Sequence, residues 1–241
     1  MIKPDSGKLI QQFQHTILIE RGLAKNTISA YGSDLKLLNR WLDSKSVSLV
    51  TAERSDLMEY LAHRLSTGAS ARSSARILST LKRFYAFLLD QRLITRDPTI
   101  LVDAPRVGRP LPDSLTEDEV NRLLDAPDVT TALGVRDRAM LELIYASGLR
   151  VSELVTLTLD QINLGQGALR VFGKGNKERL VPVGDTANHW VSRYCDQERP
   201  RCLEQNRTQS SVVFLSRRGT GMTRQAFWHT VKRHAVAAGI R

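Results

Sequence analysis

The feature that most constrains the fold of this chain is a cluster of prolines near its middle. Four of the eight prolines fall within fifteen residues: Pro98, Pro105, Pro110 and Pro112. Proline has no amide hydrogen to donate and disfavours the helical conformation in the residue before it, so such a stretch resists both helix and sheet. We therefore predict an extended linker at residues 97–114, between one domain at residues 1–96 and another at residues 115–241.

Length and composition exclude several classes of protein. A chain of 241 residues suits one large domain or two small ones. It has no apolar run of the roughly 18 residues that a membrane span needs, and its start lacks the apolar core of a signal peptide. Its two cysteines, Cys195 and Cys202, are too few for a disulfide scaffold and lack the second pair of a zinc site. We therefore expect a cytoplasmic protein with no membrane span and no metal.

The charge of the chain favours a polyanionic partner. Lys and Arg number 35 against 25 Asp and Glu, which gives a net charge of +10. Residues 1–110 hold 17 basic and 10 acidic side chains, whereas residues 111–241 hold 18 and 15. The N-terminal part is therefore the more basic for its size.

The N-terminal part has helical periodicity throughout. Apolar residues at spacings of three and four predict three helices, the first around Leu9, the second capped by Asn26 and the third capped by Ser55. In the third helix we expect Met58, Leu61 and Leu65 to face the core.

A fourth helix, which starts near Ser70, has one basic face. At about 100° per residue, Arg72, Arg76 and Arg83 fall within a narrow arc. The opposite side is apolar and comprises Ile77, Leu78, Leu81, Phe84, Tyr85 and Leu88. A basic stripe of this length suits the phosphates of DNA, and a solvated helix face is the alternative interpretation.

The part after the linker mixes helices with a pair of strands. The predicted elements, in order, are a helix with a Thr116–Glu119 capping box, helices at 136–147 and 151–157, strands at 167–172 and 179–183, a helix at 186–203, a short strand at 212–215 and a helix from 224. The predicted fold class is therefore mainly α, with a four-helix domain followed by a mixed α+β domain that contains a small antiparallel sheet.

Two cations lie where they suit phosphate chemistry. Arg150 follows the turn begun by Gly148 between two helices, so its guanidinium is held at a rigid junction and can hydrogen-bond two phosphate oxygens. Lys174 lies at the tip of the predicted hairpin, where turn glycines let the backbone come close to a groove. A structural salt bridge is the alternative interpretation for Arg150, and a solvated side chain is the alternative for Lys174.

Four stretches of the sequence carry a family resemblance. They are residues 73–79 (SSARILS), 148–154 (GLRVSEL), 173–182 (GKGNKERLVP) and 223–228 (TRQAFW). In this order they resemble the tyrosine recombinases, and the Xer branch in particular. The resemblance implies a four-helix, SAM-like core-binding domain and a mixed catalytic domain, which close together on duplex DNA.

The resemblance also implies a reaction. In this family a tyrosine hydroxyl attacks the scissile phosphodiester, which leaves a 3′-phosphotyrosyl link and a free 5′-hydroxyl, and no metal or other cofactor takes part. Arg150 matches the family's first catalytic arginine, and Lys174 matches the lysine that protonates the departing oxygen. The choice of Lys174 over Lys177 rests on register. Glu153 matches an acidic position that orients the site, and a surface or helix-pairing carboxylate is the alternative.

Two motifs of the family do not occur in this sequence. The first is His-x-x-Arg: none of the five histidines has an arginine three residues later. The arginine after His229 is Arg233, which is four residues away. The five tyrosines lie within predicted helices, and none occupies the position of the family's nucleophile. We therefore expect a catalytic domain truncated before these motifs, which binds duplex DNA without cleaving it. A DNA-binding module or decoy without catalysis and a mobile-element integrase are the alternatives.

The last helix offers residues that can read DNA. Thr223, Arg224 and Gln225 open it, and the amino end of a helix favours phosphate. Arg224 can pair with guanine and Gln225 with adenine in the major groove. A capped helix with Phe227 and Trp228 in the core is the alternative, and both interpretations hold together if the polar residues project from the other side.

Lys25 and Thr27, at the start of the second helix, are also candidates for DNA contact. The family implies a short two-arm recombination site, a partner recombinase within a tetramer and a DNA translocase that regulates it, with the resolution of joined circular chromosomes as the task. Because the helix that links neighbouring subunits should be absent, we expect a monomer in the absence of DNA.

Overall fold

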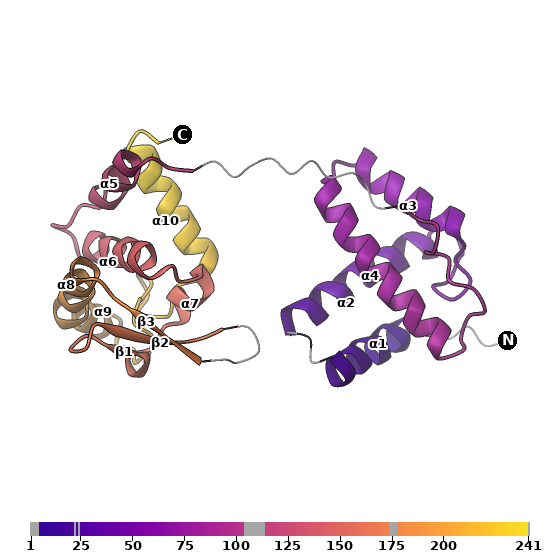
Figure 1. Cartoon of the computed structure of the whole chain (residues 1–241), viewed down its shortest axis with the longest axis horizontal. Helices are drawn as coiled ribbons and strands as arrows, with labels where there is room; N and C mark the ends of the chain where they lie inside the picture. Colours follow the sequence, from indigo (N-terminus) through magenta and orange to yellow (C-terminus); the bar gives the residue numbers. More distant parts are fainter. Residues whose placement is uncertain (1–4, 22, 24, 104–113, 174–177, 241) are drawn as a thin grey trace. The chain divides into compact units, whose positions relative to one another are not determined.

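The computed structural model, which describes residues 5–21, 23, 25–103, 114–173 and 178–240, divides between Leu111 and Pro112 into two units (Figure 1). Each unit has a hydrophobic core of its own, as separate domains require. The predicted fold class, mainly α with a small antiparallel sheet, is confirmed.

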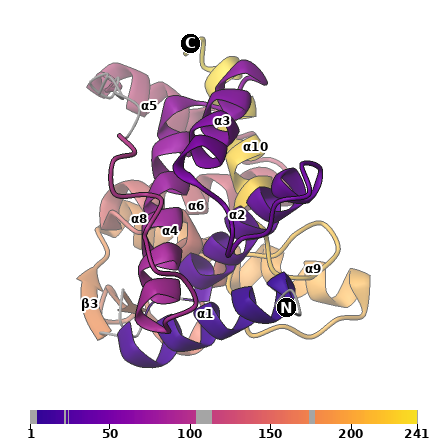
Figure 2. The same ribbon diagram turned by 90° about the vertical axis from the view of Figure 1, so that its right-hand side faces the viewer.

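Four helices form the described part of the first unit: α1 (Ser6–Arg21), α2 (Lys25–Asp43), α3 (Arg54–Ser66) and α4 (Ala71–Asp90). The α1 helix lies against the C-terminal half of α4 in both views (Figures 1 and 2), where the rings of Phe13 and Phe84 meet edge-on at 5.4 Å. Ser70 caps α4 by accepting a hydrogen bond from the N–H of Ser73. The apolar side predicted for α4 is confirmed, since all six of its residues are buried.

Two details predicted for this unit are wrong. The α2 helix begins at Lys25, so Asn26 lies inside its first turn and does not precede it as a cap. The α3 helix is capped by Glu53, and of the three residues expected to face the core Leu61 is buried, whereas Met58 and Leu65 are exposed. The buried stripe of α3 instead includes Tyr60, whose ring packs 5.5 Å from that of Trp41. The buried side of α3 is therefore formed by Leu57, Tyr60 and Leu61, and it leaves out Met58 and Leu65.

The first unit extends past α4 into the proline-containing segment. Both the N–H and the hydroxyl of Thr99 donate to Oδ1 of Asp97, at 2.8 and 2.7 Å, which closes a tight turn. Val102 then packs into the core of the four helices and is almost fully buried. Residues 97–103 are therefore part of the folded unit, and residues 104–113 of the predicted linker lie outside the described residues.

The described elements of the second unit follow the predicted order closely. They are α5 (Glu117–Asp125), α6 (Ala132–Ser147), α7 (Val151–Thr156), a 3-10 turn (Leu159–Gln161), β1 (Ile162–Asn163), β2 (Ala168–Phe172), β3 (Glu178–Pro182), α8 (Asp185–Arg193), a π-helical turn (Tyr194–Glu198), α9 (Arg199–Asn206) and α10 (Arg224–Ala237). The strands pair antiparallel in the order β1–β2–β3, with Leu169 opposite Val181 and Phe172 opposite Glu178.

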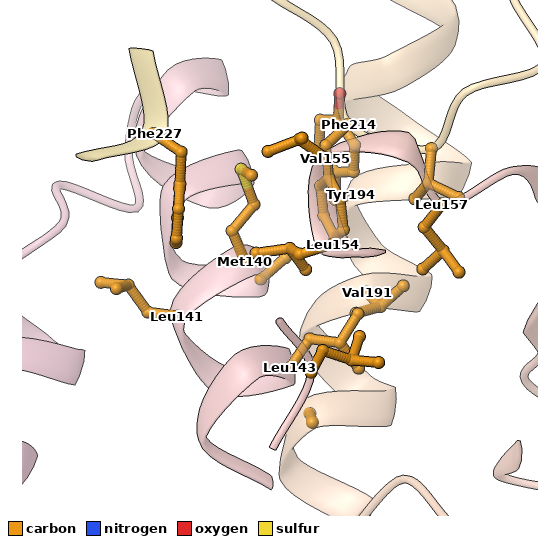
Figure 3. Packing of buried hydrophobic residues seen from close by; sticks show 14 of the residues in the cluster. Met140, Leu141, Leu143, Leu154, Val155, Leu157, Val191, Tyr194, Phe214 and Phe227 are labelled. Carbon is orange, nitrogen blue, oxygen red and sulfur yellow. The ribbon is translucent and has the colours of Figure 1, made fainter. Parts of the chain in front are cut away.

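Helix α6 passes through the core of the second unit. Figure 3 shows Met140 and Leu143 of α6 among side chains from other elements: Leu154, Val191, Tyr194, Phe214 and Phe227. The rings of Tyr194 and Phe214 stack at 5.6 Å. The core therefore holds α7 and α10, which carry candidate site residues, against the same central helix.

Some of the predicted boundaries in this unit are confirmed and others are wrong. The Thr116–Glu119 capping box and the end of α6 at Gly148 are both present. The single helix predicted at 186–203 is instead α8 and α9 joined by the π-helical turn, and Pro200 at the start of α9 has no amide to continue the earlier ladder. The strand predicted at 212–215 is absent. Val212 makes an isolated bridge to Thr158, and Leu215 makes another to Gly221.

Candidate nucleic-acid interface

The α6–α7 junction fixes the backbone of Arg150. Gly148 ends α6 in the left-handed conformation, with φ 59° and ψ 26°, and its N–H donates to the carbonyl of Ile144. Leu149 is buried in the core, and Arg150 is the N-cap of α7. The Arg150 side chain is nevertheless 65% exposed, so an anchored backbone presents this guanidinium to solvent.

The carboxylate of Glu153 holds the Arg150 side chain in place. Its Oε2 accepts the backbone N–H of Arg150 at 2.9 Å, and its Oε1 lies 3.0 Å from Arg150 Nη1. The Glu153 side chain is only 9% exposed. Burial alone would raise the pKa of this carboxyl, but N–H donors from the Arg150 backbone and from two guanidiniums hold its pKa below the usual range. The structure thus brings Arg150 and Glu153 together in an ion pair, which is the alternative interpretation that the sequence leaves open for Arg150.

Arg179 on β3, a residue not predicted from the sequence, supplies the second of these guanidiniums. Its Nη2 lies 2.9 Å from Oε2 of Glu153, and its Nη1 lies 3.3 Å from Oε1. In β3, Leu180 is exposed and Arg179 is half-buried, the opposite of what their hydropathy indicates, so the sequence carries no signal for Arg179. The predicted lysine of the site, Lys174, lies outside the described residues.

The basic face of α4 contains three arginines in different environments. Arg72 is exposed. Arg83 lies over the ring of Tyr31, with its guanidinium carbon 5.7 Å from the ring centroid. Arg76 reaches α2, where both of its terminal nitrogens contact the carboxylate of Asp34. The guanidinium of Arg76 is therefore engaged in an ion pair that joins two helices of the first unit.

The N-terminal turn of α10 presents three polar side chains. Thr223 caps the helix by accepting the N–H of Ala226 at 3.1 Å, and Arg224 and Gln225 are exposed. All three border a groove of about 1010 Å³ whose apolar wall includes Leu141 of α6 and Val151 of α7. The cap leaves amide groups of the first turn available to an anion.

Trp228 is the one predicted core residue of α10 that the structure places outside the core. Phe227 is buried as expected, but Trp228 is 51% exposed. One residue along a helix rotates the side chain by about 100°, and in α10 this step takes Trp228 from the buried side of the helix to its exposed side. Lys232, one turn later, places its ammonium 4.0 Å from the centre of the Trp228 ring.

The start of α2 contributes less to the candidate interface. Thr27 is half-buried in the first turn of the helix. Lys25 is the first residue of α2, and its side chain is not among those described.

A buried ion cluster, also missed in the sequence analysis, ties α10 to α6. Asp137 accepts hydrogen bonds from Arg136 at one carboxylate oxygen, and its other oxygen lies 2.8 Å from Arg233 Nη2 and 3.0 Å from His234 Nε2. Asp137 is almost fully buried. The cluster fixes the C-terminal half of α10 and thereby the direction in which its first turn points.

Among the described residues, no three His, Cys, Asp or Glu side chains gather as metal ligands do. None of the helices in the described ranges is long and apolar enough to cross a membrane.

Family models match both units. The model of the "Phage integrase, N-terminal SAM-like domain" matches residues 10–92, and that of the "Phage integrase family" matches residues 113–241. Among curated proteins, the chain is 53% identical to tyrosine recombinase XerD of Pseudomonas putida over 232 residues, which are 96% of this chain and 77% of the relative. It is 51% identical to XerD of Pseudomonas aeruginosa, with the same coverage.

Solved structures share the fold at low sequence identity. A lambda integrase dimer bound to a COC′ core site superposes with a TM-score of 0.71 at 20% identity, over 97% of this chain and 63% of that chain. The XerH recombinase bound to its difH substrate before cleavage gives a TM-score of 0.70 at 16% identity, over 98% of this chain and 79% of the other.

Proposed function

This chain belongs to the phage integrase family of tyrosine recombinases, and on that premise we propose that it serves site-specific DNA recombination of the XerD type. The observation that carries the proposal is the Arg150 guanidinium, exposed on a backbone anchored at the α6–α7 junction and oriented by the buried Glu153. The relatives named XerD and the DNA-bound structural neighbours support a role on duplex DNA.

The proposed chemistry follows from charge. Attack on a phosphodiester adds negative charge to the non-bridging oxygens, and a cation fixed in advance stabilises that state more than the ground state. In the family's reaction a tyrosine oxygen bonds to phosphorus as the 5′-oxygen departs, and for that step Arg150 is proposed to supply this charge and Lys174 to protonate the departing 5′-oxygen. The chain's own residues need no metal or cofactor for these steps.

The proposed DNA contacts lie in both units. In the first unit they come from Arg72 and Arg83 of α4 and from Lys25 and Thr27 at the start of α2, whereas Arg76, the third residue expected on this face, is paired with Asp34. In the second unit they come from Thr223, Arg224 and Gln225. Arginines on the α4 face would bind phosphates of any sequence, whereas Arg224 and Gln225 would read base edges.

The proposal includes partners. The DNA would carry a short two-arm recombination site, on which a second recombinase completes a tetramer and a DNA translocase regulates exchange to resolve joined chromosomes in the cytoplasm. The polypeptide of these 241 residues would be a monomer before it meets DNA. Light scattering on the free polypeptide tests the last point, and a stable tetramer without DNA contradicts it.

We also propose that this polypeptide binds DNA without forming a covalent link to it. Tyr60, Tyr85 and Tyr194 are buried, so none of these three hydroxyls is presented to a phosphate, and Tyr31 is half-buried against Phe13 and does not match the family's nucleophile. Tyr145 is exposed, but it belongs to the last turns of α6 and does not match the family's nucleophile.

A suicide substrate tests binding and cleavage together. The polypeptide is incubated with a nicked duplex that carries a recombination site of an XerD relative. We expect a shifted band on a native gel and no adduct on a denaturing gel. An adduct would overturn the claim of inactivity, and its loss in Tyr145→Phe would identify the nucleophile. Absence of any native shift would overturn the proposed DNA binding.

A further inference from the structure

Two guanidiniums converge on one carboxylate at the α7–β3 contact, that of Glu153, whose side chain is 9% exposed. Arg150 approaches Glu153 from the start of α7, and Arg179 approaches it from β3. We propose that Arg179 is a positioning residue, which keeps Glu153 paired so that the Arg150 guanidinium can leave this carboxylate for a DNA phosphate. This inference rests on the proposed function for the identity of the phosphate as that of DNA.

The hydrogen bonds show why Arg179 makes this exchange possible. The Glu153 carboxylate accepts four N–H donors: one from the Arg150 backbone, one from the Arg150 side chain and two from Arg179. If the Arg150 side chain turns away, the other three remain. Without Arg179, the same movement would leave a carboxylate of 9% exposure with no charged partner, which is strongly unfavourable.

The two arginines contact Glu153 in different ways, and the difference fits this division of roles. Arg150 uses a single nitrogen, Nη1, and its side chain is 65% exposed. Arg179 uses both terminal nitrogens and is 39% exposed. A two-point guanidinium–carboxylate contact is the more strongly oriented of the two. The weaker, more accessible contact is therefore the one that a phosphate can replace.

The neighbouring acidic residue on β3 does not compete for Arg179. Glu178 precedes Arg179, and adjacent residues of a strand point to opposite faces. The carboxylate of Glu178 lies 4.0 Å from the guanidinium of Arg170 on β2. Two positively charged arginines thus share the single negative charge of Glu153. Of the two, Arg150 is the more exposed and the more available to a phosphate.

The first test needs no DNA, so it stands apart from the proposed function. Carbon-13 NMR of the side-chain carboxyl gives the pKa of Glu153 in the wild-type chain and in two variants. We expect Arg150→Ala to keep the pKa low, because Arg179 and the backbone N–H still bind the carboxylate. We expect Arg179→Ala to raise it toward the usual range. An unchanged pKa in Arg179→Ala, or a rise only in Arg150→Ala, would overturn the inference.

The second test measures the salt dependence of binding to a random-sequence duplex. One lost phosphate contact lowers the slope of log K against log salt by about 0.9. We expect that loss in Arg150→Ala, in Arg179→Ala and also in the double variant. A loss of about 1.8 in the double variant would mean two independent phosphate contacts and would refute the positioning role. The matched control is Arg201→Ala on α9. It removes an exposed charge that lies 3.4 Å from Glu198 of the π-helical turn.

Glu153→Gln distinguishes positioning from direct contact. Once the carboxylate is gone, there is no charge for Arg179 to neutralise, so adding Arg179→Ala should leave the slope of Glu153→Gln unchanged. A further loss in that background would show that Arg179 binds phosphate itself.

Thermal melts establish that each variant folds, and Arg179→Gln replaces Arg179→Ala if Arg179→Ala does not fold. If the wild-type chain fails to bind duplex, the proposed function falls, while the carboxyl titration still decides the role of Arg179.

Discussion

Asp34 of α2 and Arg76 of α4 form a two-point ion pair, with Nη1 2.6 Å from Oδ2 and Nη2 2.8 Å from Oδ1. The Asp34 side chain is 2% exposed, and Thr80 also donates to its Oδ2 at 3.0 Å. A residue of the basic face of α4 therefore holds two helices of the first unit together.

Arg76→Ala should destabilise the first unit. Asp34 would keep only the hydroxyl of Thr80 as a partner from α4, and a buried carboxylate without its cation is unfavourable. Because Arg76 itself is half-exposed, we expect the free energy of unfolding to fall by about 2 kcal/mol. Urea denaturation measures this. Arg72→Ala, on the same face, should change it by less than about 0.5 kcal/mol, and equal losses in the two variants would contradict the assignment.

Arg224→Ala and Arg72→Ala should affect DNA binding in different ways. Arg224 opens α10 and is proposed to read one base, so its loss should reduce discrimination at one position by about 1–3 kcal/mol. Arg72 is proposed to bind phosphate, so its loss should weaken binding to every duplex and reduce the salt slope by about one. Competition binding with single-base variants of a target site separates the two. Identical losses on specific and random DNA in both variants would disprove the split.

Gly148→Ala should loosen the junction that holds Arg150. Gly148 has φ 59°, and no atom lies within 4 Å of the position that a Cβ would take, so the cost is conformational and not steric. We expect a loss of about 1 kcal/mol in stability of the second unit, measured by chemical denaturation. Gly148→Asn should lose less, because asparagine tolerates the left-handed region. A larger loss in Gly148→Asn would argue against this explanation.

The second unit should lose stability at alkaline pH through Tyr194. Burial raises the pKa of its hydroxyl from 10.0 to about 12, against the opposing hydrogen bond from the N–H of Leu215. A folded pKa above the unfolded one gives stability that is complete below pH 10 and is lost as the pH rises toward 12. Denaturation at a series of pH values should show this slope, and Tyr194→Phe should flatten it. An unchanged slope in the variant would assign the effect to other groups.

The sequence predicts most strongly where one local cause decides a structure. The capping box of Thr116 and Glu119, the cap at Thr223 and the turn at Gly148 each depend on residues within a few positions of one another. The apolar side of α4 is correct for the same reason, because a regular helix fixes which residues share a face. Met58, Leu65 and Trp228 were misplaced because a helix can turn any of several faces to its neighbours, and only those neighbours decide which one.

The sequence by itself determined the family, the fold class and the position of Arg150 at a helix junction, because these follow from motifs and periodicity along the chain. Only the tertiary structure decided which charges meet. Arg179 lies 26 residues from Glu153, Arg76 lies 42 from Asp34 and His234 lies 97 from Asp137. No pattern along the chain encodes such pairs, since an ion pair depends on distance in space and on burial, and packing sets both.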